Sequence, residues 1–120
     1  MSQTVVPMFH VPSVAKTMDW YVSHGFALVG ENREAGKVNW AKVALGDSVV
    51  MFNAGGRASA EHRREVDLYV TTADLSDWYE RLKDRVDVVE HVHETEHGMR
   101  EFIIRDVNRF WITFGEPIRT

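Results

Sequence analysis

The order of the predicted elements occurs twice in this sequence, which limits the chain to folds built from two similar halves. The tripeptide Asp-Trp-Tyr is found at 19–21 and again at 77–79. A three-residue match is weak by itself. Each copy, however, lies in a predicted amphipathic helix that follows one β-prone segment and precedes three more. The pattern predicts an internal duplication of a βαβββ unit.

The first predicted unit covers residues 5–54. A strand over 5–11 is followed by Ser13, a residue type that caps helices, and the helix after it ends at Gly25. Three β-prone segments complete the unit, and Gly46-Asp47 predicts the turn between the last two of them. These segments read FALVGE, VNWAKVAL and SVVMFNA.

The second predicted unit covers residues 65–117 and repeats this order. It follows a polar, glycine-bearing segment, 55–64, that is typical of a linker. EVDLYV predicts its first strand, Thr72 is placed to cap its helix, and three further strands follow. Those strands are VDVVEHVH, REFIIRD and RFWITF. With 120 residues, both units are expected to form one domain over 1–120.

Composition excludes several classes of function. The net charge is −4 and the Lys and Arg residues are scattered, so nucleic acid is not an expected partner. No segment resembles a signal peptide or a membrane span, and a cytoplasmic location is expected. The chain has no cysteine, which excludes disulfides, thiolate nucleophiles and thiolate metal sites.

Two segments resemble the vicinal oxygen chelate superfamily, which includes glyoxalase I, extradiol dioxygenases, methylmalonyl-CoA epimerases and bleomycin-resistance proteins. VPSVAKTMDWYVSHGF is similar to the family's first strand and helix, and HGMREFIIRDVNRFWITFGEP to its closing segment. In the closing segment Val107 and Arg109 replace the usual Pro and Gly of an Asp turn, which predicts a different turn. The resemblance implies an α+β fold in which two βαβββ modules form a curled mixed sheet around a cleft (glyoxalase/bleomycin resistance fold). It also implies a homodimer.

The resemblance further implies where a metal would be bound. Metal-using members take one ligand, usually His or Glu, from a cleft-facing position on each of four strands. Here these positions are Val6, Met51, Glu65 and Thr113. Only the carboxylate is an ordinary ligand for a hard divalent ion, so neither a metal nor another cofactor is expected. A register shifted by two residues would bring in His10 or Asp67, and two ligands are still too few.

The histidines offer a second possible metal site. His91 and His93 are alternate residues of a predicted strand, so both imidazoles can point the same way, and His97 lies just beyond. This spacing can form a zinc site, but the valine and glutamate neighbours favour an exposed strand face. His10 shares the parity of Met8, and it is interpreted either as a ligand contact or as a hydrogen-bonded structural residue.

Strand alternation separates residues that face the helices from residues that line the expected cleft. The first set is Phe9, Val11, Phe52, Leu68, Val70, Ile112 and Phe114. The predicted ligand-binding residues are Met8, His10, Trp40, Met51, Glu65, Asp67, Tyr69, His97, Trp111 and Thr113. Aromatic and thioether groups bind flat ligands, and the acidic pair would favour positive charge. As alternatives, Trp40 and Trp111 could pack at a dimer interface, and Glu65 and Asp67 could be solvated strand ends.

These features predict a metal-independent binding protein that sequesters an aromatic or cationic antibiotic, as bleomycin-resistance proteins do. No catalytic residue is assigned. The alternative is an enzyme of the glyoxalase or dioxygenase type, a lyase, isomerase or oxygenase acting on a small oxygenated substrate. A third possibility is an interaction module without a small ligand.

Overall fold

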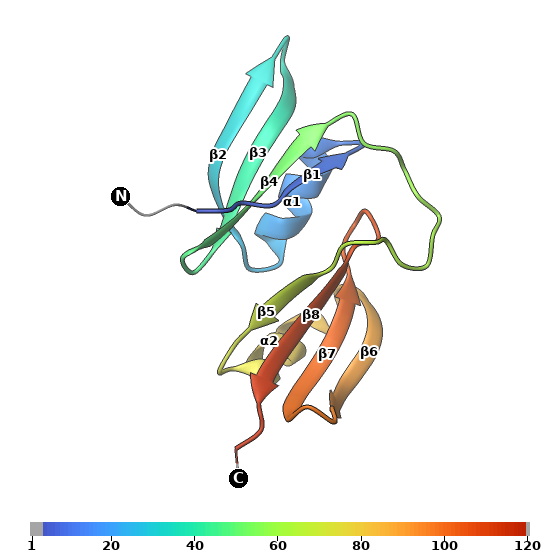
Figure 1. The fold of residues 1–120 in the computed structure, drawn as a ribbon. Helices are drawn as coiled ribbons and strands as arrows, with labels where there is room; N and C mark the ends of the chain where they lie inside the picture. The colour runs from blue at the N-terminus through green and yellow to red at the C-terminus, as the bar shows by residue number, and fades with distance from the viewer. Residues whose placement is uncertain (1–3, 120) are drawn as a thin grey trace. The chain divides into compact units, whose positions relative to one another are not determined.

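The computed structural model describes residues 4–119, which form two compact units divided between Ser59 and Ala60 (Figure 1). The first unit contains β1 (Met8–Val11), α1 (Val14–Ser23), β2 (Ala27–Glu34), β3 (Lys37–Leu45) and β4 (Ser48–Ala54). The second contains β5 (Leu68–Thr71), α2 (Leu75–Leu82), β6 (Asp87–Glu94), β7 (Met99–Arg105) and β8 (Trp111–Pro117). Neither helix within 4–119 has the length and apolarity needed to span a bilayer.

The two units have the same sheet topology. The strand order is β1-β4-β3-β2 in the first sheet and β5-β8-β7-β6 in the second (Figure 1). In each sheet the first strand runs parallel to the last, and the remaining neighbours are antiparallel. A parallel pair needs a long crossover, which the helix after the first strand provides. The predicted α+β fold of two βαβββ modules is confirmed.

In the first unit one face of the sheet packs against α1. Phe9, Val11 and Phe52 are buried on that face, as alternation predicts. Tyr21 of α1 has no exposed surface, and its ring centroid lies 4.8 Å from that of Phe52. Ser13 caps the helix as expected, since its hydroxyl accepts a hydrogen bond from the backbone N–H of Lys16 at 3.2 Å.

In the second unit the aromatic packing is different. Phe102 and Phe114 stack with centroids 4.9 Å apart and planes 6° from parallel, and Trp78 of α2 lies 5.1 Å from Phe114. Phe9 and Val70 are equivalent residues, because they pair with Phe52 and Phe114 in the two sheets. The first Asp-Trp-Tyr starts ten residues after Phe9 and the second seven residues after Val70, a difference of three. The modules are therefore equivalent in element order, while the tripeptide occupies positions almost one helical turn apart.

The start of the second unit differs from the sequence prediction in two places. Thr72 is not the N-cap of α2: the cap is Asp74, and the Thr72 hydroxyl accepts a hydrogen bond from the Asp74 N–H. The helix starts later because Thr72 forms a local turn with its own backbone instead. The strand predicted from Glu65 begins only at Leu68, because the preceding residues are held to another part of the unit, as described below.

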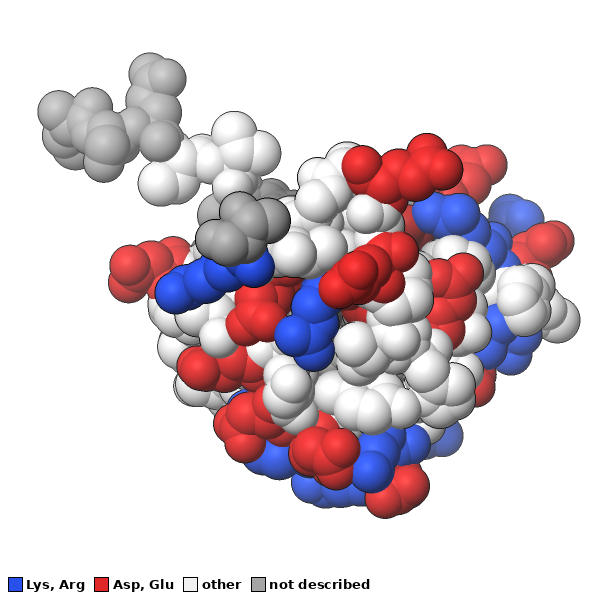
Figure 2. All heavy atoms as spheres, turned by 90° about the horizontal axis from the view of Figure 1, so that it is seen from below, with Lys and Arg blue, Asp and Glu red and all other residues white. Residues whose placement is uncertain are grey.

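The charges on the surface are mixed. On the face drawn in Figure 2, acidic and basic side chains are interspersed, and the basic ones do not gather into a patch. A duplex binder needs a concentrated positive field to displace counterions from phosphates. This face does not provide one.

Candidate ligand-binding faces

The register of the strands makes the two sheets comparable residue by residue. On the face away from α1, Met8 pairs with Met51, and Met51 pairs with Lys42. On the face away from α2, the same row consists of Tyr69, Thr113 and Ile103. The next row is His10, Asn53 and Trp40 in the first unit, and Thr71, Gly115 and Glu101 in the second. We call these two surfaces the open faces of the units.

The open face of the first unit contains the four ligand-binding residues predicted there. Met8 is 45% exposed, and Met51 and Trp40 are half-buried. The Trp40 indole extends over Gly30 on β2, where a Cβ would lie 3.2 Å from two of its ring atoms. His10 is exposed at the edge, with Nδ1 3.3 Å from the Ala54 carbonyl oxygen. This face therefore presents thioether and indole surface beside an imidazole.

The open face of the second unit carries a buried carboxylate. Glu101 on β7 is only 7% exposed. The hydroxyl of Tyr69 donates a hydrogen bond to Glu101 Oε2 at 2.6 Å, and His97 Nε2 lies 3.4 Å from the same oxygen. The phenol reaches across β8 above Gly115, since a Cβ on that glycine would overlap the hydroxyl end of the ring.

This hydrogen bond changes the acidity of the phenol. Burial of the hydroxyl end, followed by the hydrogen bond to Glu101 and the negative charge of that residue, raises the pKa of Tyr69 to about 12. A tyrosinate next to this carboxylate would lose the bond and gain charge repulsion. Tyr69 is therefore a persistent donor toward Glu101, although half of the residue remains exposed.

The two acidic residues predicted from the sequence are placed differently. Asp67 precedes β5 and forms an ion pair with Arg63 at 2.5 Å. The Arg63 guanidinium also lies over the Trp111 ring, 4.2 Å from its centroid. Glu65 is exposed and borders a hollow of about 540 Å³ together with Phe110. The remaining residues around this hollow are Glu61, Arg63, Arg64 and Val66.

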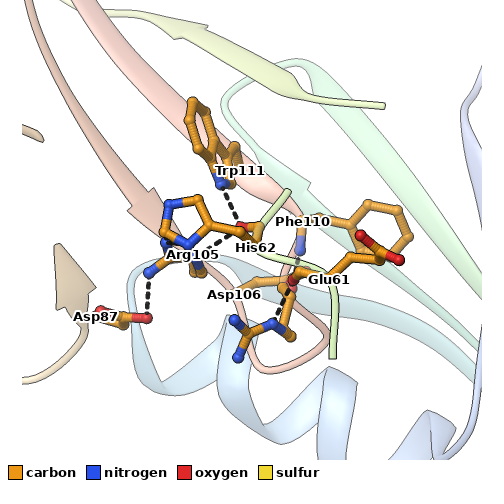
Figure 3. A network of polar contacts seen from close by, with 8 residues as sticks. Glu61, His62, Asp87, Arg105, Asp106, Phe110 and Trp111 are labelled. Carbon is orange, nitrogen blue, oxygen red and sulfur yellow. Dashed lines mark hydrogen bonds and ion pairs between the residues drawn. The ribbon is translucent and has the colours of Figure 1, made fainter. Parts of the chain in front are cut away.

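The backbone of Glu61 and His62 is attached to the end of β7, the following turn and the start of β8 (Figure 3). The buried Arg105 donates from Nε to the His62 carbonyl at 3.0 Å and from Nη1 to Asp87 Oδ2 at 2.6 Å. Trp111 Nε1 donates to the same carbonyl at 3.2 Å. Arg109 Nε donates to the Glu61 carbonyl at 2.5 Å. These bonds satisfy backbone acceptors that a strand would otherwise pair, which explains why β5 begins late.

The turn before β8 keeps an Asp-centred geometry without Pro or Gly. Asp106 Oδ1 accepts hydrogen bonds from the backbone N–H groups of Asn108 and Phe110, at 2.7 and 2.9 Å. Arg109 has a φ of 71°, in the left-handed region that glycine adopts most easily. A non-glycine residue there costs on the order of 1 kcal/mol, and the Arg109 and Asp106 bonds offset it.

The sequence matches the profile of the Glyoxalase/Bleomycin resistance protein/Dioxygenase superfamily over residues 5–114. The chain belongs to this superfamily. A search of curated proteins finds none that matches it in sequence.

Several solved structures resemble the chain over nearly its whole length. TioX from Micromonospora sp. ML1 is 19% identical, with a TM-score of 0.77 and coverage of 98% of this chain and 100% of that one. A bleomycin-binding protein complexed with bleomycin is 17% identical, with a TM-score of 0.73 and coverage of 96% and 98%. TnmS3, an antibiotic binding protein from Streptomyces sp. CB03234, is 23% identical, with a TM-score of 0.69 and coverage of 98% of each chain. At these identities the likeness concerns the fold.

The positions that hold metal in other superfamily members do not fit a metal here. Met51 and Thr113 are equivalent residues of β4 and β8. When the same register is extended toward the N-terminus of each first strand, the residue equivalent to Val6 is Asp67 and not Glu65. The Asp67 carboxylate is already paired with Arg63. Valine cannot coordinate, and thioether and lone hydroxyl groups bind hard divalent ions weakly. Within residues 4–119 no group of three or more His, Asp or Glu side chains is arranged to hold an ion.

The histidines on β6 lie on opposite faces of the sheet, so the arrangement that their spacing would allow, with both imidazoles on one side, is not formed. His91 Nδ1 lies 2.6 Å from the Tyr79 hydroxyl on α2. His93 pairs in register with Glu101 on the open face and has Nε2 3.3 Å from Glu90. An irregularity in the register between Glu90 and His93 breaks the alternation of a regular strand.

Strand β7 contributes residues that the sequence prediction omitted. Glu101, Ile103 and Arg105 are on the open face, because Phe102 and Ile104 are buried on the helix side. The sequence REFIIR contains this information, since its first and third apolar residues, Phe102 and Ile104, are alternate residues of a strand and leave Glu101 and Ile103 on the other face. The contacts of Tyr69 and His97 with Glu101 link the second unit's predicted residues to one that was not predicted.

Proposed function

We propose that this protein captures a flat aromatic, positively charged small molecule, such as an antibiotic, without a metal and without a chemical step. The observation that carries this proposal is the residue pair Met51 and Thr113. They occupy equivalent positions on β4 and β8, where metal-using relatives have ligands, and they offer a thioether and a hydroxyl instead. Neither position offers a strong ligand for a hard ion, so on each unit the side chain is available to an organic ligand rather than to a divalent ion.

The residues around these positions support binding of a planar molecule. Trp40 and Tyr69 lie beside them on the open faces, and Met8 is flexible and polarizable. Aromatic side chains supply large contact surfaces that lose little conformational entropy on binding, and methionine adapts to irregular shapes. The bleomycin and antibiotic binding named for two similar structures supports the same assignment by analogy of fold.

Calorimetric titration with a panel of planar cationic antibiotics tests the proposal. Trp40→Ala is expected to weaken binding about tenfold or more, because it removes a stacking surface. Trp20→Ala is the matched control, since Trp20 lies on α1 against Tyr21 and His24, on the other side of the sheet. Wild-type protein that binds no member of the panel would contradict the proposal.

Two further features belong to the proposal. Binding is expected to persist after treatment with a chelator, whereas an enzyme of the glyoxalase or dioxygenase type would lose its activity. We also propose a homodimer, as the family resemblance implies, which light scattering coupled to gel filtration would test. A monomer that binds ligand with unchanged affinity would remove the dimer from the account and leave the binding role.

A further inference from the structure

Glu101 is a buried carboxylate on the open face of the second unit, and no lysine or arginine contacts it within residues 4–119. Arg105, four residues further along β7 on the same face, is occupied by Asp87 and the His62 carbonyl. Arg100, the adjacent residue, is directed to Glu116. The imidazole of His97, 3.4 Å from Oε2, is the basic group beside it and pairs with it as an ion only when protonated. A carboxylate without a permanently charged partner is costly to bury, so its presence here calls for a further compensating group.

The contacts of Glu101 leave one of its oxygens available. The Tyr69 hydroxyl and His97 Nε2 both approach Oε2. Oε1 has no hydrogen-bond donor among the described residues. A carboxylate has about four acceptor positions, so one hydroxyl and one imidazole leave much of its capacity unused. The hydrogen bond from Tyr69 holds Oε2 and leaves Oε1 available as an acceptor.

We propose that Glu101 determines the specificity of the binding site: Oε1 accepts a hydrogen bond from a protonated amine or amidine of the ligand, while the ligand's ring packs on Tyr69. This inference rests on the proposed function and assigns its charge recognition to one residue. A charge-assisted bond to a desolvated carboxylate is stronger than the same bond in water. Tyr69 acts as a positioning residue through its bond to Oε2.

The two acidic residues suggested by the sequence are less suited to this role. Asp67 is neutralised by Arg63. Glu65 is exposed outside the strand, where solvent screens its attraction for a ligand cation. Glu101 differs from both in its burial, and within residues 4–119 its only basic neighbour is the His97 imidazole, with no lysine or arginine in contact. Of the three carboxylates, Glu101 is therefore expected to attract a ligand cation most strongly.

Two tricyclic probes of nearly equal shape separate charge recognition from stacking. In mildly alkaline buffer 9-aminoacridine is a cation and acridine is uncharged. Wild-type protein is expected to bind the aminoacridine about tenfold or more tightly than acridine, since hydrogen bonds to charged groups are the stronger kind. Glu101→Gln is expected to remove this preference and to change acridine affinity less than about twofold. Glu65→Gln, the matched control, is expected to keep the preference.

Tyr69→Phe provides a second readout that does not remove the carboxylate. It keeps the ring and deletes the donor to Oε2, so the preference for the cation should fall by less than in Glu101→Gln, with acridine binding unchanged. Circular dichroism and thermal unfolding of each variant check that the fold is retained. If Glu101→Gln does not fold, Glu101→Asp, which keeps the charge but withdraws it from the ligand, must show the reduced preference.

The outcomes distinguish this inference from the function on which it rests. A wild-type protein that binds both probes, with a preference that survives in Glu101→Gln or is lost in Glu65→Gln, overturns the role of Glu101 and leaves capture intact. A wild-type protein that binds neither probe, nor any antibiotic of the panel, overturns both. A preference that is lost in Glu101→Gln, reduced in Tyr69→Phe and kept in Glu65→Gln supports the inference.

Discussion

The two units of this protein share a backbone pattern and use their open faces in different ways. In the first unit Trp40 extends over Gly30, among thioether and amide groups. In the second, Tyr69 extends over Gly115 and ends at the carboxylate of Glu101. Trp40 and Glu101 occupy equivalent positions on β3 and β7. The duplicated element order fixes where side chains are presented, while their chemistry has diverged: the first face carries an indole and thioethers beside Lys42, and the second carries a phenol bound to a buried carboxylate.

The cores show the same divergence. The tripeptide Asp-Trp-Tyr buries its tyrosine in α1, where Tyr21 contacts Phe52 and has no exposed surface. In α2 the shifted copy places Trp78 against Phe114, and Tyr79 contacts Phe102 while remaining partly exposed. The same tripeptide therefore contributes a fully buried tyrosine to one core and a partly exposed one to the other.

The largest predicted effect tests this inequality. Tyr21→Ala removes a fully buried ring and is expected to lower the free energy of unfolding by about 3–5 kcal/mol. Tyr79→Ala removes a partly exposed ring and is expected to cost about 1–2 kcal/mol. Chemical denaturation of both variants measures the difference. Equal costs would show that the two copies are equivalent after all.

The two glycines beneath the aromatic rings give the next largest effect. Gly115→Ala places a methyl group on the Tyr69 hydroxyl, so the ring must leave Glu101, and the expected cost is about 1–3 kcal/mol. Gly30→Ala meets the Trp40 ring at 3.2 Å, and a small shift of the indole should hold its cost below about 1 kcal/mol. Thermal unfolding compares them. A larger loss of stability in Gly30→Ala than in Gly115→Ala would show that the Trp40 ring, and not the Tyr69 ring, is the more tightly packed.

The smallest predicted effect is a shift in titration. The folded-state pKa of Tyr69 is raised to about 12, above its ordinary value of 10.0. The folded state therefore binds the proton of the Tyr69 hydroxyl more tightly than the unfolded state does. The stability that this hydroxyl contributes to the fold is complete below the unfolded pKa and is lost as pH rises through the folded pKa. The tyrosinate difference spectrum between wild type and Tyr69→Phe should have its midpoint near 12, and Glu101→Gln should lower it. An unchanged midpoint in Glu101→Gln would remove the bond between these residues from the account.

The sequence predicts the fold well because its signals are local and repeated. Alternating apolar residues identify the strands and their helix-facing sides, Ser13 identifies a helix start, and the turn at Gly46-Asp47 joins β3 to β4. The boundaries of β5 and α2 were predicted less well. Both depend on contacts with residues far along the chain, such as the hydrogen bond of Arg105 to the His62 carbonyl, which a local pattern does not contain.

The candidate site could be predicted only in part from the sequence. Strand parity places Met8, Met51, Trp40 and Tyr69 on the open faces. It does not reveal that Arg63 neutralises Asp67, because that pairing depends on a segment outside any strand. It also does not reveal that His91 and His93 face opposite sides of the sheet. The register irregularity in β6 that separates them has no signal in the sequence VDVVEHVH.

The most direct test of metal-independent capture is a calorimetric titration of chelator-treated protein with the antibiotic panel, followed by mass spectrometry of the recovered ligand. We expect saturable binding that added Mg²⁺, Zn²⁺, Mn²⁺ or Ni²⁺ does not strengthen, and a recovered ligand whose mass is unchanged. Binding that appears only when a divalent ion is restored, with a ligand of altered mass, would contradict metal-independent capture.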